Sequence, residues 1–155
     1  MSIRTDRLGP WAVAIAITFT GCQAPATISH DLTATDLAAV RAVWDDMEAL
    51  DTDWDAIQQF LTDDFVHLDP RTPSLVGVEA WREWVESMEL GDEQGQYIVE
   101  EVAGSGDMAY LRWSFNGSWT ESGELVETQG KGISIYARMP DGTWRVSRNV
   151  WNPTS

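Results

Sequence analysis

The sequence predicts an α+β domain in which three N-terminal helices pack on one face of a curved antiparallel sheet. The main observation is a change of hydrophobic period. Apolar residues recur every three or four positions before residue 90 and at alternate positions after Gln94. Short connections rich in glycine, aspartate and serine join the later segments, as they do in a meander of neighbouring strands. The chain has 155 residues, which is enough for one domain.

Residues 1–21 have the pattern of a signal peptide. A weakly basic start precedes the apolar run 11–19, which is too short to span a membrane. The segment Phe19-Thr20-Gly21-Cys22 resembles a bacterial lipobox, which implies a lipid on the Cys22 sulfur and attachment to the membrane of the cell envelope through that lipid alone. Residues 22–32 would then be the lipidated cysteine and a tether. The alternative is an ordinary leader with an incidental cysteine, and a secreted protein.

The protein is strongly acidic, with a formal net charge of −15 at pH 7. Phosphates and anionic lipid headgroups repel such a chain, so the charge argues against nucleic acids and membrane surfaces as partners. The same acidity also serves solubility, which requires no partner. Cys22 is the single cysteine of the sequence, so no disulfide can form within the chain and packing must provide the stability.

The first two helices are predicted from caps and apolar stripes. Thr33 and Asp36 have the spacing of a capping box, so the first helix is expected to begin near Thr33 or Thr35. Its apolar face carries Leu37, Val40, Trp44 and Met47. Asp53 is a suitable N-cap for the second helix, which the polar residues 62–64 are expected to end. Its stripe consists of Trp54, Ile57 and Leu61.

A short strand ending at Asp69-Pro70 is expected next. His67 and Asp69 are two positions apart, so alternation places both side chains on one face of this strand. They are candidate acid/base groups, since the ordinary histidine pKa of about 6.5 suits proton transfer near neutral pH. The structural alternatives are a hydrogen-bonded histidine that lines a cavity and an Asp-Pro turn that closes the strand.

The rest of the chain predicts one more helix and four strands. After a loop at residues 71–74, the helix covers about residues 78–90, and Gly91 suits its C-terminal end. The strands are expected over 96–103, 108–117, 125–138 and 144–151. Turn sequences such as Pro140-Asp141-Gly142 connect them, so they are expected to form an antiparallel meander.

The order of these elements resembles the nuclear-transport-factor-2-like superfamily of cone-shaped α+β domains, and within it the SnoaL-like and ketosteroid-isomerase-like branch. Three features carry the resemblance: segment 53–70 with its final Asp-Pro, the segment from Pro73 to Trp84, and the closing hairpin from Pro140 to Asn152. The resemblance covers about residues 33–153. It implies a sheet wrapped around a deep pocket for a small molecule. Because this fold commonly dimerises through its sheet, it also implies a homodimer.

The resemblance also implies roles for single residues. Ketosteroid isomerases use the aspartate of an Asp-Pro on this strand as general base, which would be Asp69 here. They complete the site with an oxyanion hole made by a tyrosine and a protonated carboxylic acid. Asp45 and Ser134 stand at those two places in this sequence, and an ionised Asp45 would repel an enolate. The departure argues against steroid isomerase activity.

Strand alternation and the first helix suggest which other side chains share the pocket. The candidate ligand-binding residues are Trp44, Trp113, Phe115, Ser134, Tyr136, Ser147, Asn149 and Trp151. They fit an isomerase or lyase that uses Asp69 and His67, or a non-catalytic protein that binds a partly apolar small molecule. A third hypothesis is a dimeric scaffold, with Tyr110 and Trp119 at the interface if they face outward. No cofactor is implied, and His67 and Asp69 alone are too few ligands for a metal.

Overall fold

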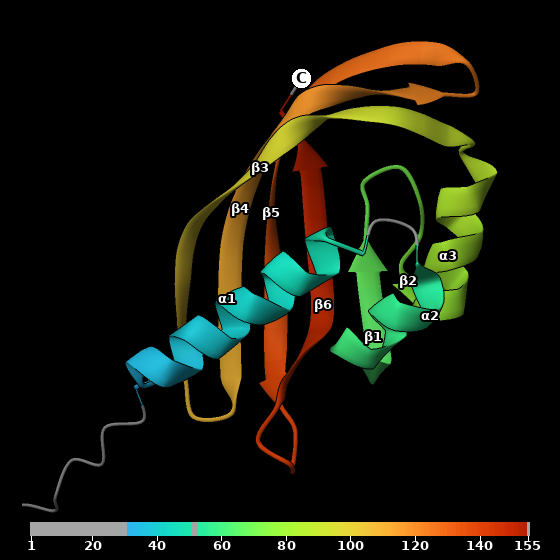
Figure 1. Ribbon diagram of the computed structural model, residues 1–155. Helices are drawn as coiled ribbons and strands as arrows, with labels where there is room; N and C mark the ends of the chain where they lie inside the picture. Colours follow the sequence, from blue (N-terminus) through green and yellow to red (C-terminus); the bar gives the residue numbers. More distant parts are fainter. Residues whose placement is uncertain (1–30, 51–52, 155) are drawn as a thin grey trace, which may run out of the picture.

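The computed structural model describes residues 31–50 and 53–154, which form helices and a six-stranded curled sheet (Figure 1). The predicted signal peptide, Cys22 and the tether up to residue 30 lie outside the described residues. The last two residues assigned to the tether lie against the domain. Asp31 forms a β-bridge with Ser105, and Leu32 packs on the hydrophobic core.

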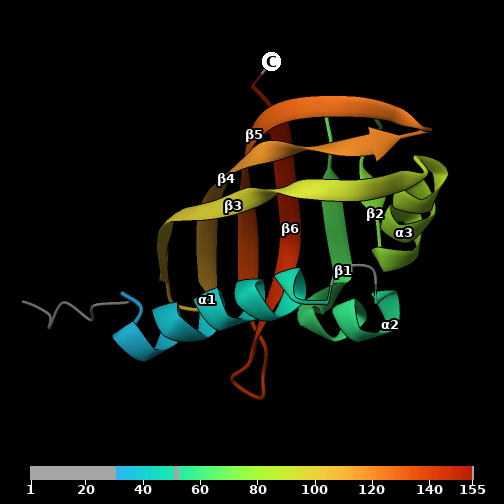
Figure 2. The same cartoon turned by 45° about the horizontal axis from the view of Figure 1, so that its top comes forward.

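Three helices lie inside the curl of the sheet. In α1 (Ala34–Glu48) the Thr33 side chain accepts a hydrogen bond from the Asp36 amide and the Asp36 carboxylate accepts one from Thr33, which confirms the predicted capping box. Asp53 caps α2 (Trp54–Ile57), which continues as the short 3-10 helix η1 (Gln58–Phe60). The third helix, α3 (Val78–Ser87), lies beside the first two strands at one end of the sheet (Figure 2).

The sheet has the strand order β2-β1-β6-β5-β4-β3. Its strands are β1 (Leu61–Leu68), β2 (Leu75–Val76), β3 (Leu90–Ser105), β4 (Met108–Glu121), β5 (Glu124–Arg138) and β6 (Trp144–Pro153). Strands β3 to β6 form the predicted antiparallel meander, and β3, β4 and β5 bend toward the end of the sheet where α3 lies (Figure 2). β1 pairs with β6 in parallel, which the sequence did not indicate. The α+β class with helices on a curled, mainly antiparallel sheet is confirmed.

The hydrophobic core lies where α1 and β1 meet the middle of the sheet. Val40 of α1, Phe65 of β1 and Leu111 of β4 are each 1% exposed or less. Burying an apolar side chain of this size contributes about 1.5–3 kcal/mol to folding. No helix among the described residues is long and apolar enough to cross a membrane.

The prediction that residues 62–64 end a helix is wrong. The helical segment ends at Phe60 and β1 begins at Leu61, which pairs with Val146 of β6. The Arg148 guanidinium on β6 donates to the Asp64 backbone oxygen at 2.9 Å and to its carboxylate at 3.1 Å, across 84 residues of sequence. Pairing with a distant strand therefore overrides the local turn pattern.

The third helix is shorter than predicted and the strands are longer. α3 ends at Ser87, the chain turns at Glu89 with a φ of 49°, and Gly91, which was expected to end the helix, already lies in β3. β3 starts early because Leu90 pairs with Glu121 at the end of β4. β2, which follows the predicted loop, pairs with the end of β1.

Candidate functional site

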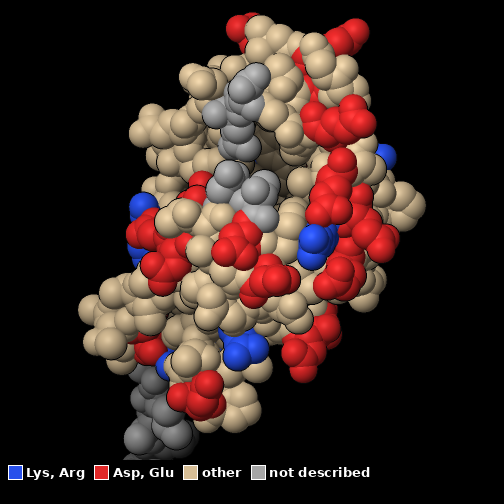
Figure 3. Space-filling model, turned by 45° about the vertical axis from the view of Figure 1, so that its right-hand side comes forward, with Lys and Arg blue, Asp and Glu red and all other residues tan. Residues whose placement is uncertain are grey.

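A cavity of about 230 Å³ lies among the sheet, α1 and α3. Figure 3 shows the surface hollowed on this side of the molecule. Six of the nine tryptophans of the chain line the cavity: Trp44, Trp81, Trp84, Trp113, Trp119 and Trp151. A concave site that is mainly aromatic and holds a few polar groups is typical of small-molecule binding.

One side of the cavity, which we call the sheet wall, consists of Trp113, Gly132 and Trp151 with the rings that pack on them. These three residues are direct neighbours in register on β4, β5 and β6. The two indole rings are nearly parallel, with an interplanar angle of 5° and centroids 6.1 Å apart. Gly132 permits this arrangement, because a Cβ there would collide with the Trp113 ring and the Val150 carbonyl.

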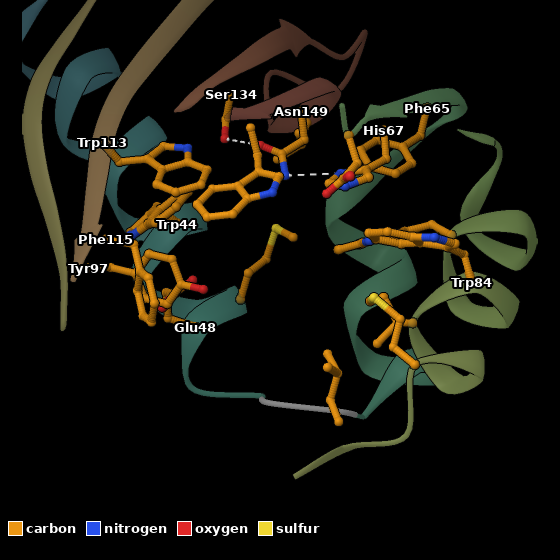
Figure 4. A pocket seen from close by; sticks show the side chains of 18 of the residues that line it. Trp44, Glu48, Phe65, His67, Trp84, Tyr97, Trp113, Phe115, Ser134 and Asn149 are labelled. Atoms are coloured by element: carbon orange, nitrogen blue, oxygen red, sulfur yellow. Dashed lines mark hydrogen bonds between the residues drawn. The ribbon is translucent and has the colours of Figure 1, made fainter. Parts of the chain in front are cut away.

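α1 extends the sheet wall toward the opening of the cavity. The Trp44 ring lies 5.5 Å from the Trp113 ring and 5.9 Å from the Tyr97 ring, centroid to centroid. Glu48 follows one helical turn after Trp44, so both side chains reach the cavity from the same face of α1. Figure 4 shows Glu48 close to the aromatic rings on this side.

The adjoining side, which we call the polar wall, consists of Ser134, Asn149, His67, Asp69 and Arg71. Ser134, Asn149 and His67 are neighbours in register on β5, β6 and β1. The Ser134 hydroxyl donates to Asn149 Oδ1 at 2.9 Å, and Asn149 Nδ2 lies 3.3 Å from His67 Nδ1 (Figure 4). Since an amide nitrogen only donates, Nδ1 of His67 is the acceptor and its ring proton belongs on Nε2.

His67 is neutral at physiological pH. The pKa of its imidazole is lowered to about 4, chiefly by burial; the Asp69 carboxylate opposes this shift and the Arg71 guanidinium adds to it. The side chain is 5% exposed and stacks on Trp81, with ring centroids 5.3 Å apart and an interplanar angle of 19°. The ring is therefore fixed on one face by an indole and at one nitrogen by an amide.

The Asp69 carboxylate is held by Arg71 at the end of β1. Its Oδ1 accepts from the Arg71 backbone amide at 2.8 Å and from Nε at 3.1 Å, and its Oδ2 accepts from Nη2 at 3.3 Å. The Asp69 side chain is 1% exposed, whereas that of Arg71 is 42% exposed. Arg71 also contacts Glu121 at 3.4 Å and lies over the Trp84 ring at 5.3 Å. The buried carboxylate is thus compensated within the wall itself.

The structure brings most of the predicted site residues together. His67 and Asp69 line the cavity, and so do Trp44, Trp113, Phe115, Ser134, Asn149 and Trp151. Two predicted residues do not line it. Tyr136 is completely buried in the core. A β-bulge between Val146 and Arg148 turns Ser147 away, its hydroxyl donates to the Ile135 carbonyl, and Val146 takes its place in the lining.

The residues aligned with the isomerase oxyanion hole lie apart. Ser134 faces the cavity, but Asp45 is absent from its described lining and pairs with Arg41 on the outside of α1 at 2.8 Å. Trp119, proposed as an interface residue if outward, lines the cavity instead and donates to Glu121 at 3.3 Å. Among the residues with described positions, no three His, Cys, Asp or Glu side chains gather as a metal site requires.

Sequence reasoning missed several lining residues. Arg71 was assigned to a loop, and only the fold shows that it folds back onto Asp69. Trp81 and Trp84 were assigned to the apolar stripe of the third helix, where period alone does not separate core from cavity lining. Glu48 lies one turn beyond Trp44, and that spacing was the available signal.

Comparison with known protein families assigns this chain to one of them. A family model described as a SnoaL-like domain matches residues 28–147. The chain belongs to the SnoaL-like domain family. No curated protein matches it significantly. The match covers the SnoaL-like domain from before α1 into β6, so both walls of the cavity fall within it, apart from the end of β6.

Many solved structures share the fold of this SnoaL-like domain. A ketosteroid isomerase-like protein from Erwinia carotovora atroseptica is 23% identical, with a TM-score of 0.71 over 79% of this chain and 99% of its own. A conserved protein from Planctomyces limnophilus is 25% identical, with a TM-score of 0.64 over 77% and 98%. A proposed dehydratase of the NTF2-like family from Streptomyces avermitilis is 19% identical, with a TM-score of 0.61 over 78% and 97%.

Proposed function

We propose that this SnoaL-like domain binds a small, largely apolar molecule in its aromatic cavity and does not turn it over. The single observation that carries the proposal is that both candidate bases are already engaged. The Asp69 oxygens accept three hydrogen bonds from Arg71. The acceptor nitrogen of His67 faces the Asn149 amide. A general base needs a lone pair that can reach the proton it removes.

The remaining groups suit binding. The nearly parallel indole rings of Trp113 and Trp151 give the cavity an apolar aromatic lining. A neutral His67 whose Nδ1 accepts leaves its Nε2–H as a donor, which would orient a ligand through a carbonyl or hydroxyl oxygen. Hydrolysis, elimination or isomerisation would require one of the engaged bases to exchange its partner for the substrate.

Calorimetric titration with 2-naphthol, a flat neutral molecule with one hydroxyl group, tests the binding site. Val85 of α3 lines the cavity, so Val85→Trp should fill it and abolish binding. The matched control is Val76→Trp, because Val76 is 66% exposed and outside this lining, and it should bind like the unmodified protein. Equal binding by both variants would place the site elsewhere.

Catalysis is tested with 5-nitrobenzisoxazole, a carbon acid that opens when a base removes its proton. We expect the same rate with the unmodified protein and with Val85→Trp, because Arg71 holds the Asp69 carboxylate and Asn149 faces the acceptor nitrogen of His67. A faster rate that disappears in Asp69→Asn or His67→Gln would contradict the non-catalytic proposal and restore the isomerase or lyase hypothesis.

We also propose the envelope anchor, on the strength of the lipobox-like segment before Cys22. In a bacterial host, Cys22→Ser should abolish labelling by a radioactive fatty acid and release the protein from the membrane fraction. A variant that stays in the membrane fraction would contradict the lipid anchor without affecting the binding proposal.

The homodimer predicted from the resemblance stays a proposal. A groove on the outer face of the sheet supports it, since Ile133, Ile135 and Val150 are apolar and Ile133 is 39% exposed there. Light scattering of residues 23–155 should give twice the monomer mass, and Ile133→Glu should halve it. A monomer at every concentration would remove the proposal.

A further inference from the structure

The charges around the cavity are unequal. Its described lining contains the carboxylates of Glu48 and Asp69 and one guanidinium, that of Arg71. Arg71 donates to both Asp69 oxygens and to Glu121, so its hydrogen-bonding groups are directed at carboxylates of the protein. An anionic ligand would have to displace these carboxylates, and the Asp69 side chain that it left behind is 1% exposed.

The sheet wall and the neighbouring Glu48 carboxylate attract positive charge. Trp44, Tyr97 and Trp113 contact one another beside Glu48, and Figure 4 shows the carboxylate on the same side as these rings. The faces of aromatic rings carry partial negative charge and attract organic cations, tryptophan most strongly. A carboxylate next to such rings adds a full negative charge to the same attraction.

The surface around the opening has the same sign. On the face shown in Figure 3, acidic side chains lie to the right of the hollow and below it, and they clearly outnumber basic ones. The net charge of −15 produces a field that raises the local concentration of cations and repels anions. The field outside and the groups inside the cavity therefore select for the same sign of charge.

We infer that the ligand is an organic cation, an amine or quaternary ammonium with an apolar body, whose charged group lies between Glu48 and the rings of Trp44, Tyr97 and Trp113. This inference rests on the proposed binding function and specifies its ligand class. The apolar part of the ligand would lie along the indoles of Trp113 and Trp151.

Three molecules of similar shape and different charge test the inference by calorimetry. They are choline, its neutral carbon analogue 3,3-dimethylbutan-1-ol, and the anion 3,3-dimethylbutanoate. Choline should bind about tenfold more tightly than the alcohol, as expected for a desolvated cation on aromatic rings. The anion should bind more weakly than either. Equal binding of choline and the alcohol, or tighter binding of the anion, would overturn the inference.

Glu48→Gln tests the position of the charge. It should reduce choline binding severalfold and leave the alcohol unchanged. Asp46→Asn removes the same charge from the same helix but outside the described lining, so it should leave choline binding nearly unchanged. Equal losses in both variants would show that the overall field, and not Glu48, selects the cation. If the unmodified protein did not bind 2-naphthol, the binding function itself would be refuted. Failure of the cation inference and failure of the binding proposal are therefore distinguishable.

Discussion

The two walls of the cavity are built in different ways. In the sheet wall the strands contribute only uncharged side chains, beside which Glu48 of α1 lies, and the indoles lie over a glycine in one register row of β4, β5 and β6. The polar wall combines a buried carboxylate, a guanidinium, an imidazole and an amide, and each is bonded to another member of the wall. The sheet wall therefore presents apolar rings to a ligand, whereas the polar groups of the polar wall bond to one another.

The comparison shows that side chains of a type suited to catalysis can contribute to stability instead. His67 and Asp69 have the residue types of a catalytic pair, yet their partners bind the atoms that catalysis would use. The tryptophans have no catalytic chemistry, but six of them line the cavity that a ligand would enter. The comparison predicts that substitutions in the sheet wall affect both stability and binding, whereas substitutions in the polar wall mainly affect stability.

The largest effect is expected for Trp113→Ala. Trp113 is 4% exposed and contacts the rings of Trp44, Tyr97 and Trp151. Removing its ring should lower the free energy of unfolding by about 3–5 kcal/mol and abolish 2-naphthol binding. Urea unfolding followed by circular dichroism measures the first effect. Trp84→Ala, which removes the half-buried ring of α3, is the comparison and should cost less; equal losses would mean that the position of Trp113 in the sheet wall adds nothing to its effect.

The next effect is the pH dependence that His67 gives to stability. Its pKa is about 4 in the folded protein, below the value of 6.5 expected when unfolded. As the pH falls below 6.5 the unfolded chain takes up a proton first, so stability is lost between pH 6.5 and 4 and the loss is complete below 4. The difference corresponds to about 3 kcal/mol.

Urea unfolding of the unmodified protein and of His67→Gln at pH 7.5 and at successively lower pH values measures this effect. The carboxylates titrate in both proteins, so the difference between the two curves isolates His67. The unmodified protein should lose stability more steeply between pH 6.5 and 4. Parallel curves would mean that His67 has the same pKa in the folded and unfolded protein.

Gly132→Val should have a smaller effect on stability but a large one on binding. The new side chain must displace the Trp113 ring, which should cost about 1–3 kcal/mol and disrupt the sheet wall. The control is Lys131→Val on the exposed face of the same strand, which should change neither property. Thermal unfolding of both variants measures the change in stability, and titration with 2-naphthol measures the change in binding. Retained binding in Gly132→Val would show that the ligand does not use the indole pair.

The smallest of these effects is expected for Arg71→Gln. The substitution removes two donors from the buried Asp69 carboxylate but keeps the backbone amide, so we expect a loss of about 1–2 kcal/mol. The added substitution Asp69→Asn should recover part of it, because the uncompensated charge disappears. A double variant that is less stable than Arg71→Gln would contradict this account. Binding of 2-naphthol should persist in both.

Several features of the fold follow from local sequence. The Thr33 and Asp36 cap, the Asp53 cap and the alternation that places His67 and Asp69 on one face were all predictable, because each depends on residues within four positions of one another. The family resemblance, carried by the order of the elements and segments such as 53–70, gave the curled sheet and the enclosed cavity.

The sequence by itself determined the α+β class, the α1 cap and the aromatic character of the strands that form the sheet wall. The tertiary structure alone decided which of those groups meet. The parallel pairing of β1 with β6 places His67 opposite Asn149, and a single bulge replaces Ser147 with Val146 in the cavity. Alternation is a local property with a period of two residues. Register between strands about 80 residues apart is selected by the packing of the whole sheet, and a shift of one residue exchanges its faces.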